Sequence, residues 1–286
     1  MILVLGATGR IGSAVVRQLS DLRIPLRILA RRPEAARAAV GPDVEIVAGD
    51  LDEPERLAAA FTDIQSVFLL TTQSPRQEAQ EAAAIAAARA AGVGHVVKVS
   101  AGDAATSPDS PTPVGRSHAA TEALLKASGM SWTLLRPAPF MQVALEPVLA
   151  SARETGKLVL PLGRAKVAFV DVDDIARAAV WALINPVPAS GRTLVLTGPE
   201  SLGLSDLRDR FALALQRPLG ESSPPMFLVR LILGRRIADP FLRRHQLALL
   251  GLMRAGRLAA VSNDLLNVTG QPGRSVADWL ASLPRT

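Results

Sequence analysis

Three glycines near the start of the chain place the strongest constraint on its fold. Residues 3–12 read Leu-Val-Leu-Gly-Ala-Thr-Gly-Arg-Ile-Gly, so glycines stand at positions 6, 9 and 12, directly after a short apolar run. Gly6 permits a sharp turn, Gly9 leaves space for a pyrophosphate beside the backbone, and Gly12 lets a helix pack closely on the strand. The spacing predicts a strand, a phosphate-binding turn and a helix whose N-terminus faces the phosphates. A tight turn without a ligand is the alternative.

Short apolar runs alternate with amphipathic stretches as far as Pro137. The runs expected to form strands are Met1–Leu5, Leu26–Ala30, Val44–Ala48, Ser66–Thr71, His95–Ser100 and Trp132–Arg136. The stretches expected to form helices are Ile11–Leu22, Pro33–Val40, Pro54–Phe61, Pro75–Ala91 and Ser117–Ser128. Apolar strands separated by helices are typical of a parallel sheet that is covered on both faces, which predicts an α/β, doubly wound parallel Rossmann sheet.

The alternation weakens beyond Pro137. Lys166–Val170 and Thr193–Thr197 are expected to form strands that rejoin the sheet or make a small satellite sheet, whereas the chain from Ser201 onward reads as mostly helical. We therefore predict a Rossmann domain over residues 1–140, and we expect residues 166–198 to rejoin it. Residues 141–165 and 199–286 form a smaller, mainly helical substrate and lid lobe.

Composition excludes several classes of site. The 286 residues include no cysteine and only three isolated histidines, His95, His118 and His245, so we expect no disulfide, no cysteine nucleophile and no metal site. We expect His95 to be structural and His245 to lie at the surface. The net charge of +6 comes mostly from arginines spread along the chain with few aromatics, which argues against nucleic acid as a partner. No apolar run reaches the ~20 residues of a membrane span and no leader precedes the first strand, so we expect no membrane partner and a cytoplasmic protein.

The end of the second predicted strand indicates which dinucleotide binds. An NAD site usually carries an acidic residue there, which binds the ribose diol, but this strand is followed by Arg31 and Arg32. Guanidinium groups bind a 2′-phosphate through paired hydrogen bonds, which favours NADP(H); a solvated loop is the alternative. Asp50 is expected beside the adenine or as a helix cap. The complete predicted cofactor-binding set is Gly6, Thr8, Gly9, Arg10, Ile11, Arg31, Arg32, Asp50, Leu51, Thr71, Thr72, Ser100, Ala101, Pro137 and Phe140.

Several motifs together resemble one family. Residues 6–12, 31–34 and 49–51, followed by residues 133–141, 169–176 and 269–272, resemble the NmrA-like, atypical short-chain dehydrogenase/reductase family over nearly the whole chain. Within it, the chain is similar to type 2 NADPH quinone oxidoreductases and more distantly to isoflavone reductase-like enzymes. The resemblance implies bound NADP(H). It leaves open whether the protein is a reductase or binds the dinucleotide only as a redox signal.

The chain contains no tyrosine, which excludes the Tyr-x-x-x-Lys proton donor of common short-chain dehydrogenases. His118 and Glu122 stand four residues apart on one face of a predicted helix. A carboxylate beside an imidazole favours its charged form and orients it, so we predict His118 as proton donor and Glu122 as its partner. The resemblance adds that His118, counted back from Gly129, aligns with the lysine that isoflavone reductase-like enzymes use. A purely structural histidine is the alternative.

Three functions are consistent with these features. The first, which we favour, is an NADPH-dependent oxidoreductase that transfers hydride to a quinone, an enone or a ketone, including one on an aromatic or polyketide-like scaffold. The second is a non-catalytic NADP(H)-binding redox sensor or regulator, and the third an isomerase or cyclase with a structural cofactor. Residues 226–257 mix large aliphatics with seven arginines and one acid, Asp239, and we expect them to form an apolar lid; a dimer surface or a membrane-surface helix is the alternative. We expect a small, apolar substrate and a monomer or homodimer.

Overall fold

The computed structural model describes residues 1–42 and 44–284. It contains two compact units, which we call the first and the second unit. The first unit comprises Met1–Ala101, Val114–Arg136 and Ile175–Leu194. The second comprises Gly102–Pro113, Pro137–Asp174 and Val195–Thr286.

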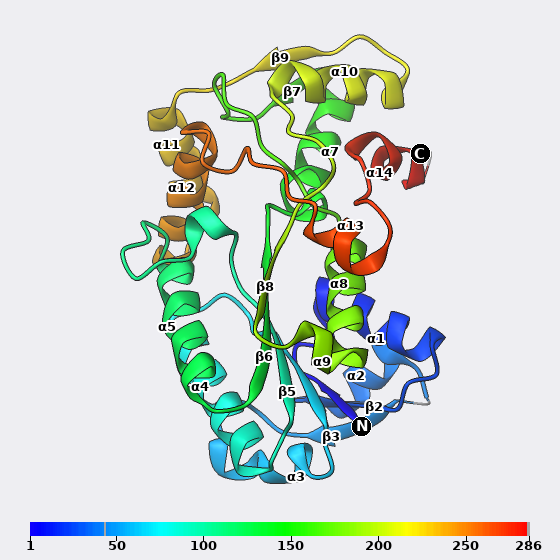
Figure 1. Ribbon diagram of the computed structural model, residues 1–286. Helices are drawn as coiled ribbons and strands as arrows, with labels where there is room; N and C mark the ends of the chain where they lie inside the picture. The colour runs from blue at the N-terminus through cyan, green and yellow to red at the C-terminus, as the bar shows by residue number, and fades with distance from the viewer. Residues whose placement is uncertain (43, 285–286) are drawn as a thin grey trace. The chain divides into compact units, whose positions relative to one another are not determined.

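A seven-stranded sheet forms the centre of the first unit (Figure 1). Its strands are β1 (Ile2–Val4), β2 (Leu26–Ala30), β3 (Glu45–Ala48), β4 (Ser66–Leu69), β5 (His95–Val99), β6 (Ser131–Pro137) and β8 (Arg192–Leu196), in the order β3-β2-β1-β4-β5-β6-β8. The first six pair in parallel; Val4, for example, lies opposite both Ile28 and Phe68. The chain reverses its direction of travel across the sheet between β1 and β4, the place where open α/β sheets bind ligands. The predicted doubly wound Rossmann fold is confirmed.

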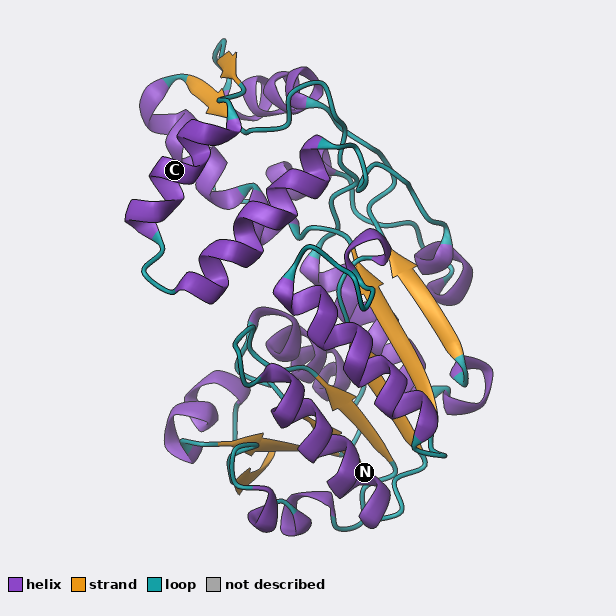
Figure 2. Cartoon of the chain, turned by 90° about the vertical axis from the view of Figure 1, so that its left-hand side faces the viewer, coloured by secondary structure: helices purple, strands orange, loops and turns teal. Residues whose placement is uncertain are grey.

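Helices cover both faces of this sheet. They are α1 (Arg10–Asp21), α2 (Pro33–Val40), η1 (Pro54–Arg56), α3 (Ala58–Phe61), α4 (Gln77–Ala90), α5 (Pro113–Ala127), α8 (Val172–Ile184) and α9 (Pro186–Ala189). Helices α4 and α5 lie on one face, as Figures 1 and 2 both show, and α1, α2 and α8 lie on the other. All five residues of β5 are consequently buried. Leu3, Phe61, Val67 and Ile85 belong to the apolar core that the sheet forms with α3 and α4.

The turn between β1 and α1 is held by very close backbone contacts. Gly6 has a φ of +71°, and a Cβ added to it would lie 2.6 Å from the carbonyl oxygen of Leu70. A Cβ added to Gly12 would lie only 2.0 Å from the carbonyl oxygen of Gly6. Glycine at these positions therefore lets α1 begin directly against the turn.

The second unit is mainly helical and has a core of its own. Its elements are η2 (Asp103–Ala105), α6 (Met141–Ala144), α7 (Glu146–Thr155), α10 (Leu204–Leu215), α11 (Met226–Arg236), α12 (Pro240–Arg254), α13 (Asp264–Thr269) and α14 (Val276–Ser282), with a two-stranded sheet of β7 (Lys157–Val159) and β9 (Gly220–Ser222). Phe169, Phe211 and Trp279 are buried at the centre of this core.

Two expected elements differ in the structure. Lys166–Val170 forms isolated bridges, between Val167 and Leu202 and between Phe140 and Val170, in place of a strand. The backbone N–H groups of Val167, Ala168 and Val170 donate to three separate segments, so no continuous ladder develops. The helix expected over Pro54–Phe61 is divided into η1 and α3. Thr193–Thr197, in contrast, corresponds to β8, which joins the sheet beside β6 as one of the two expected alternatives.

We predict that Gly12→Ala destabilises the protein, because its methyl group would overlap the Gly6 carbonyl. The free energy of unfolding should fall by about 2 kcal/mol or more, as expected for overpacking a rigid contact. Gly9→Ala is the matched control: Gly9 has a φ of −81°, and its added Cβ would meet only the Gly6 oxygen, at 3.3 Å. Denaturant unfolding that gives equal stability for both variants would contradict this account of the turn.

Candidate active site

A cavity of about 400 Å³ lies in the first unit, beside the β1–α1 turn and the ends of β2, β3 and β4. Eight residues of the predicted cofactor set line it: Gly6, Thr8, Arg31, Arg32, Asp50, Leu51, Thr71 and Thr72. Gly9 is the N-cap of α1, which continues with Arg10 and Ile11, and Ser100 and Ala101 follow β5. Pro137 and Phe140 belong to the second unit.

The residues of this cavity fit a dinucleotide. The turn presents glycine backbone at the N-terminus of α1, where N–H groups and the helix dipole favour a pyrophosphate. Arg31 and Arg32 are both exposed at the end of β2, the position at which an NAD site carries an acid. Among the described residues that line the cavity, Asp50 is the only carboxylate. Two arginines thus line the cavity at the end of β2, and their binding of a 2′-phosphate stays a prediction.

The loop after β3 is held by its own side chains, and the contact of Asp50 with an adenine stays a prediction. An oxygen of the Asp50 carboxylate accepts a hydrogen bond from the backbone N–H of Asp52 at 3.1 Å, an arrangement that stabilises the loop. Asp52 in turn pairs with Arg76 at 2.6 Å and accepts from Gln80 at 2.9 Å. Arg76 and Gln80 line the cavity too, and neither was predicted. An arginine directly before α4, on the loop that follows β4, was the available signal.

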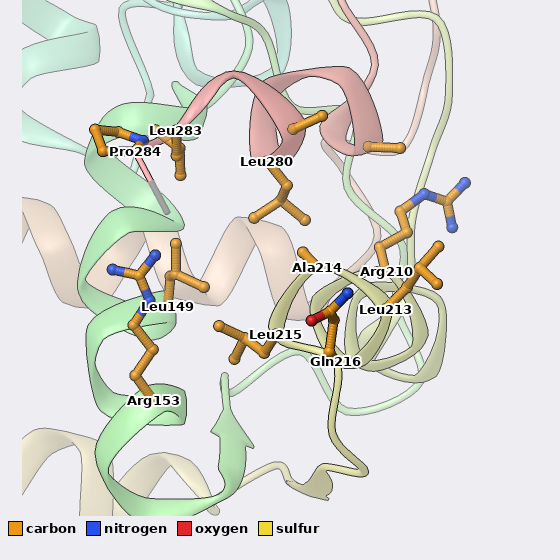
Figure 3. A pocket seen from close by; sticks show the side chains of 12 residues that line it. Leu149, Arg153, Arg210, Leu213, Ala214, Leu215, Gln216, Leu280, Leu283 and Pro284 are labelled. Carbon is orange, nitrogen blue, oxygen red and sulfur yellow. The ribbon is translucent and has the colours of Figure 1, made fainter. Parts of the chain in front are cut away.

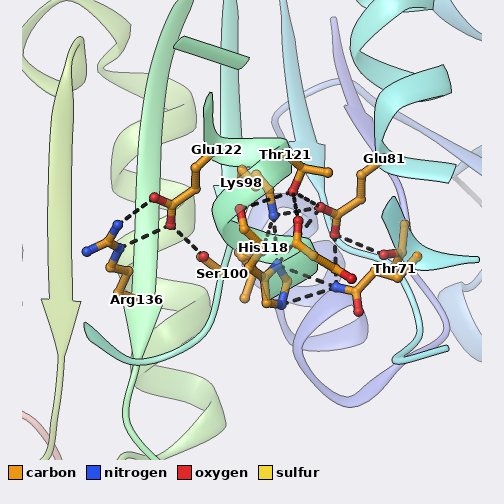
Figure 4. Close-up of polar contacts among 11 residues, drawn as sticks. Thr71, Glu81, Lys98, Ser100, His118, Thr121, Glu122 and Arg136 are labelled. Carbon is orange, nitrogen blue, oxygen red and sulfur yellow. Dashed lines mark hydrogen bonds and ion pairs between the residues drawn. The ribbon is translucent and has the colours of Figure 1, made fainter. Parts of the chain in front are cut away.

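A buried lysine organises the polar groups near the end of β5 (Figure 4). Lys98 is fully buried, and its Nζ lies 2.7 Å from Oε2 of Glu81, 2.9 Å from Nδ1 of His118 and 3.1 Å from the carbonyl oxygen of Val99. An ammonium has three N–H donors, so these three acceptors match its full capacity.

Glu81, on α4, is the carboxylate beside the imidazole. Its Oε2 lies 3.9 Å from Nδ1 of His118, and its oxygens accept hydrogen bonds from Thr71 at 3.0 Å and Thr121 at 2.7 Å. Burial by itself raises the pKa of Glu81, but the Lys98 ammonium, with smaller contributions from His118 and Thr121, lowers it to about 2. Glu81 is therefore a permanent anion at neutral pH. Thr71 also lines the cavity, so this network and the cavity share a side chain.

Glu122 has partners other than those expected. Although it stands one turn after His118 on α5, its carboxylate binds the Arg136 guanidinium with two hydrogen bonds, of 3.0 and 2.5 Å, and accepts a third from Ser100 at 2.6 Å. These contacts attach α5 to the ends of β5 and β6. Glu81 and Lys98, neither of them predicted, lie against the His118 ring, and the role predicted for Glu122 stays a prediction. The catalytic role of His118 stays a prediction.

The other two histidines are buried. His95 hydrogen-bonds Ser131 at 2.7 Å and Thr133 at 3.1 Å, and burial lowers its pKa to about 4, as suits the structural role expected for it. His245, expected at the surface, is instead buried within the second unit, where burial lowers its pKa. No group of three or more His, Cys, Asp or Glu side chains that could hold a metal occurs among residues 1–42 and 44–284.

The second unit contains a separate cavity of about 400 Å³ between α7, α10 and α14 (Figure 3). Leu149, Leu215 and Leu280 make much of its wall apolar, while Arg153 and Arg210 lie at its edges. Arg210 forms an ion pair with Glu200. The described residues that line this cavity include no carboxylate and no histidine, so it lacks the groups for proton transfer.

A Rossmann sheet with a glycine turn and an arginine-lined cavity defines a nicotinamide dinucleotide-binding protein. The chain belongs to the NAD(P)H-binding family, whose sequence model matches residues 6–186. It is 36% identical over 279 residues to the NAD(P)H azoreductase of Xenophilus azovorans, and this alignment covers 98% of this chain and 96% of that protein. It is 34% identical to a (4-alkanoyl-5-oxo-2,5-dihydrofuran-3-yl)methyl phosphate reductase of Streptomyces griseus, with 98% and 97% covered. Quinone oxidoreductase 2 of Escherichia coli is 30% identical, over 72% of each chain.

Solved structures show the same fold. The E. coli quinone oxidoreductase QOR2 complexed with NADPH aligns with a TM-score of 0.87 at 23% identity, covering 98% of this chain and 99% of that one. The triphenylmethane reductase of Citrobacter sp. complexed with NADP(H) aligns with a TM-score of 0.86 at 21% identity, covering 98% of each.

These comparisons confirm the predicted family and make the protein an NAD(P)H-dependent oxidoreductase. They also confirm the predicted cofactor: the family binds NAD(P)H, and both solved structures contain NADPH or NADP(H). Across the part of the chain that the structure describes, no helix combines the length and apolar character needed to cross a membrane. The predicted boundaries and roles of the two domains stay predictions.

We predict that replacing Arg31 and Arg32 together with Ala weakens NADPH binding by ~10- to 100-fold, the scale of one or two charge-assisted hydrogen bonds. NADH binding should change far less, because NADH lacks the 2′-phosphate. Calorimetry with both cofactors measures the difference. Arg89→Ala, an exposed arginine on α4 outside the cavity, is the control. Equal losses for NADPH and NADH would show that these arginines do not select the cofactor.

We also predict a pH-dependent contribution of Glu81 to stability. Its pKa in the folded protein, about 2, lies below the ordinary 4.5, so its charge stabilises the fold above pH 4.5 and that contribution is lost as the pH falls toward 2. Glu81→Gln should lower the free energy of unfolding at pH 7 on the order of 3 kcal/mol. The difference from the wild type should shrink between pH 4.5 and 2. Glu78→Gln, at an exposed position of α4, should have little effect at any pH. Chemical unfolding over a pH series tests this, and a pH-independent difference would refute it.

Proposed function

We propose that the protein is an NADPH-dependent reductase that transfers hydride to an electron-poor, conjugated double bond, as in a quinone or an enone, on a small apolar molecule. The preference for NADPH rests on Arg31 and Arg32, at the place where an acidic residue would favour NAD. A ketone remains within the proposed range, though it depends more strongly on a proton donor than a quinone does.

The names of three relatives support this substrate class. A quinone and a 4-alkanoyl-5-oxo-2,5-dihydrofuran each carry a C=C bond conjugated to carbonyl groups, and an azo group is a double bond between two electronegative nitrogens. Such acceptors delocalise the negative charge that hydride brings, so they need less help from an acid. The absence of tyrosine from this chain is consistent with that chemistry.

The observation that carries the proposal is the side chain of Thr71. It lines the cofactor cavity and donates to Glu81, which holds Lys98 beside His118. The predicted proton donor is therefore hydrogen-bonded, through two side chains, to the wall of the dinucleotide site. Bound NADPH would supply the hydride. The chain itself binds the phosphates at the turn and at Arg31 and Arg32, and holds a proton at His118.

Oxidation of NADPH at 340 nm tests the proposal with menadione, an azo dye and a cyclic enone as acceptors. We predict turnover with at least one of them. His118→Ala should lower kcat by ~10²-fold or more while leaving the affinity for NADPH nearly unchanged, as expected for loss of a general acid. Leu124→Ala, on an exposed position of the same helix, is the control and should behave as wild type.

The outcomes separate the competing functions. A large loss with intact NADPH binding supports His118 as the acid. Retained kcat in the variant means that water supplies the proton and removes His118 from the mechanism. Tight NADPH binding by a wild type that reduces none of the acceptors would overturn the reductase in favour of a dinucleotide-binding regulator.

A further inference from the structure

Helix α11 is apolar on two sides, and one of them is exposed. On the covered side it buries Val229. A helix has about 3.6 residues per turn, so four large apolar residues share an arc of about 140° on the opposite side. They are Phe227, Leu228, Leu231 and Ile232, with exposed fractions of 71, 39, 52 and 45%. A helix that is apolar all round is typical of one that is covered on all sides, so this exposed face of α11 is a candidate interaction surface.

The segment that contains this face is positively charged and has almost no acidic residues. Residues 226–257 include seven arginines and one acid, Asp239. The Asp239 carboxylate is the N-cap of α12 and accepts hydrogen bonds from the backbone N–H groups of Phe241 and Leu242, at 2.8 and 3.4 Å. The one negative charge of the segment therefore stabilises the start of α12.

Three of these arginines line a groove between α11 and α12, the two helices of a hairpin (Figure 2). The groove has a volume of about 420 Å³, and its lining includes Arg230, Arg243 and Arg244. Arg243 also donates to the carbonyl oxygen of Ile237 at 3.2 Å. The described residues that line the groove include no carboxylate. Guanidinium groups bind phosphate through paired hydrogen bonds, so the groove fits a phosphate group.

An apolar helix face beside a phosphate-binding groove fits one class of partner. We propose that the hairpin of α11 and α12 binds the surface of a bilayer that contains anionic phospholipid, with its arginines at the headgroup phosphates and the exposed face of α11 among the upper acyl chains. A basic segment and an apolar face are two signals that together hold a protein on such a surface. We expected no membrane partner because no apolar run can span a bilayer, but a helix that lies in the surface needs no span. This inference is independent of the proposed reductase function.

Charge complementarity favours this partner over a second copy of the chain. By helical spacing, Arg230 and Arg236 flank the exposed face of α11, and Arg235 lies within it. In a symmetric dimer the same surface meets itself, so these arginines would approach their own copies, and like charges oppose association. Anionic headgroups attract the same arginines, and a hydrocarbon layer accepts an apolar face without a matching shape.

Co-sedimentation of the full chain with vesicles tests the proposal. We expect binding to phosphatidylcholine vesicles that contain about 30% phosphatidylglycerol, little binding to phosphatidylcholine alone, and weaker binding at high salt. Replacing Arg230, Arg243 and Arg244 together with Gln should weaken binding ~100-fold, because each arginine near an anionic surface contributes roughly fivefold.

The matched control replaces three exposed arginines on helices of the first unit with Gln, and so lowers the net charge by the same amount. These are Arg17, Arg89 and Arg116. The control should bind the anionic vesicles much more tightly than the hairpin variant. Equal losses in the two variants would show an effect of net charge alone and would overturn the assignment to the hairpin.

Two further variants test contact with the acyl chains. Phe227→Ala combined with Leu231→Ala removes apolar area and leaves every charge, and it should weaken vesicle binding ~10-fold or more. The fluorescence of Phe227→Trp should shift to the blue when anionic vesicles are added. Leu124→Trp, at an exposed position of α5 in the first unit, is the control and should show no shift. Vesicle binding that depends on neither Phe227 nor Leu231 would overturn the proposal.

Other partners predict different results. Release of the protein from vesicles by inorganic phosphate, but not by chloride at equal ionic strength, would assign the groove to a free phosphate compound. Self-association that the double alanine variant abolishes would assign the exposed face to a second copy. Binding to polyglutamate as tight as to vesicles would assign the hairpin to an acidic protein. A raised KM for the acceptor in the double alanine variant, with unchanged vesicle binding, would assign the face to the expected lid. Each of these results, like the absence of vesicle binding, would overturn the proposal and leave the reductase untouched.

Discussion

The first unit depends on the stabilisation of one buried ammonium. Removing a charge from water costs several kcal/mol, and the fully buried Lys98 offsets that cost with a carboxylate, an imidazole and a backbone carbonyl. These partners come from α4, α5 and β5, so the hydrogen bonds to Lys98 hold two helices against the centre of the sheet. Thr71 extends the network to the cavity wall. The dinucleotide site and the predicted proton donor are therefore parts of one hydrogen-bonded structure, prepared before any ligand arrives.

The sequence predicted those parts of the fold whose signals are local. The glycine turn, β2 and α2 follow from residues adjacent in the chain, and Pro33 marks the first helical position of α2. The second unit was harder to predict because its short elements depend on distant partners: β7 pairs with β9 some sixty residues later. The apolar run Val167–Val170 has the pattern of a strand, but its backbone groups are divided among three segments. Pattern alone shows that such a run is buried without showing what it pairs with.

The candidate site divides in the same way. The glycines of the β1–α1 turn and the arginines after β2 could be predicted as cofactor residues because each lies at a fixed place in a known strand-turn-helix motif. Lys98 and Glu81 were missed because they come together only after the sheet has formed. One signal was available: a lysine within His-Val-Val-Lys-Val, a run otherwise typical of a buried strand, must find a partner inside the protein. Glu122 shows the opposite limit, since helical spacing placed it near His118 but could not reveal that Arg136 and Ser100 bind it.

The hairpin of α11 and α12 gives the molecule an unusual distribution of charge. Of 32 basic and 26 acidic residues, seven arginines and one aspartate lie in residues 226–257, which leaves 25 of each sign in the rest of the chain. Residues 226–257, which comprise α11, α12 and the three residues that follow, thus account for the net charge of +6. On α11 these arginines accompany exposed apolar side chains, among them Phe227 and Leu231. The excess positive charge is thus concentrated in one segment, and the rest of the chain is neutral overall. At about 0.1 M salt, the electric field of these exposed arginines is screened over about 10 Å, whereas the buried charges of the first unit are screened much less. Retention on a cation exchanger will therefore depend mainly on whether residues 226–257 are exposed.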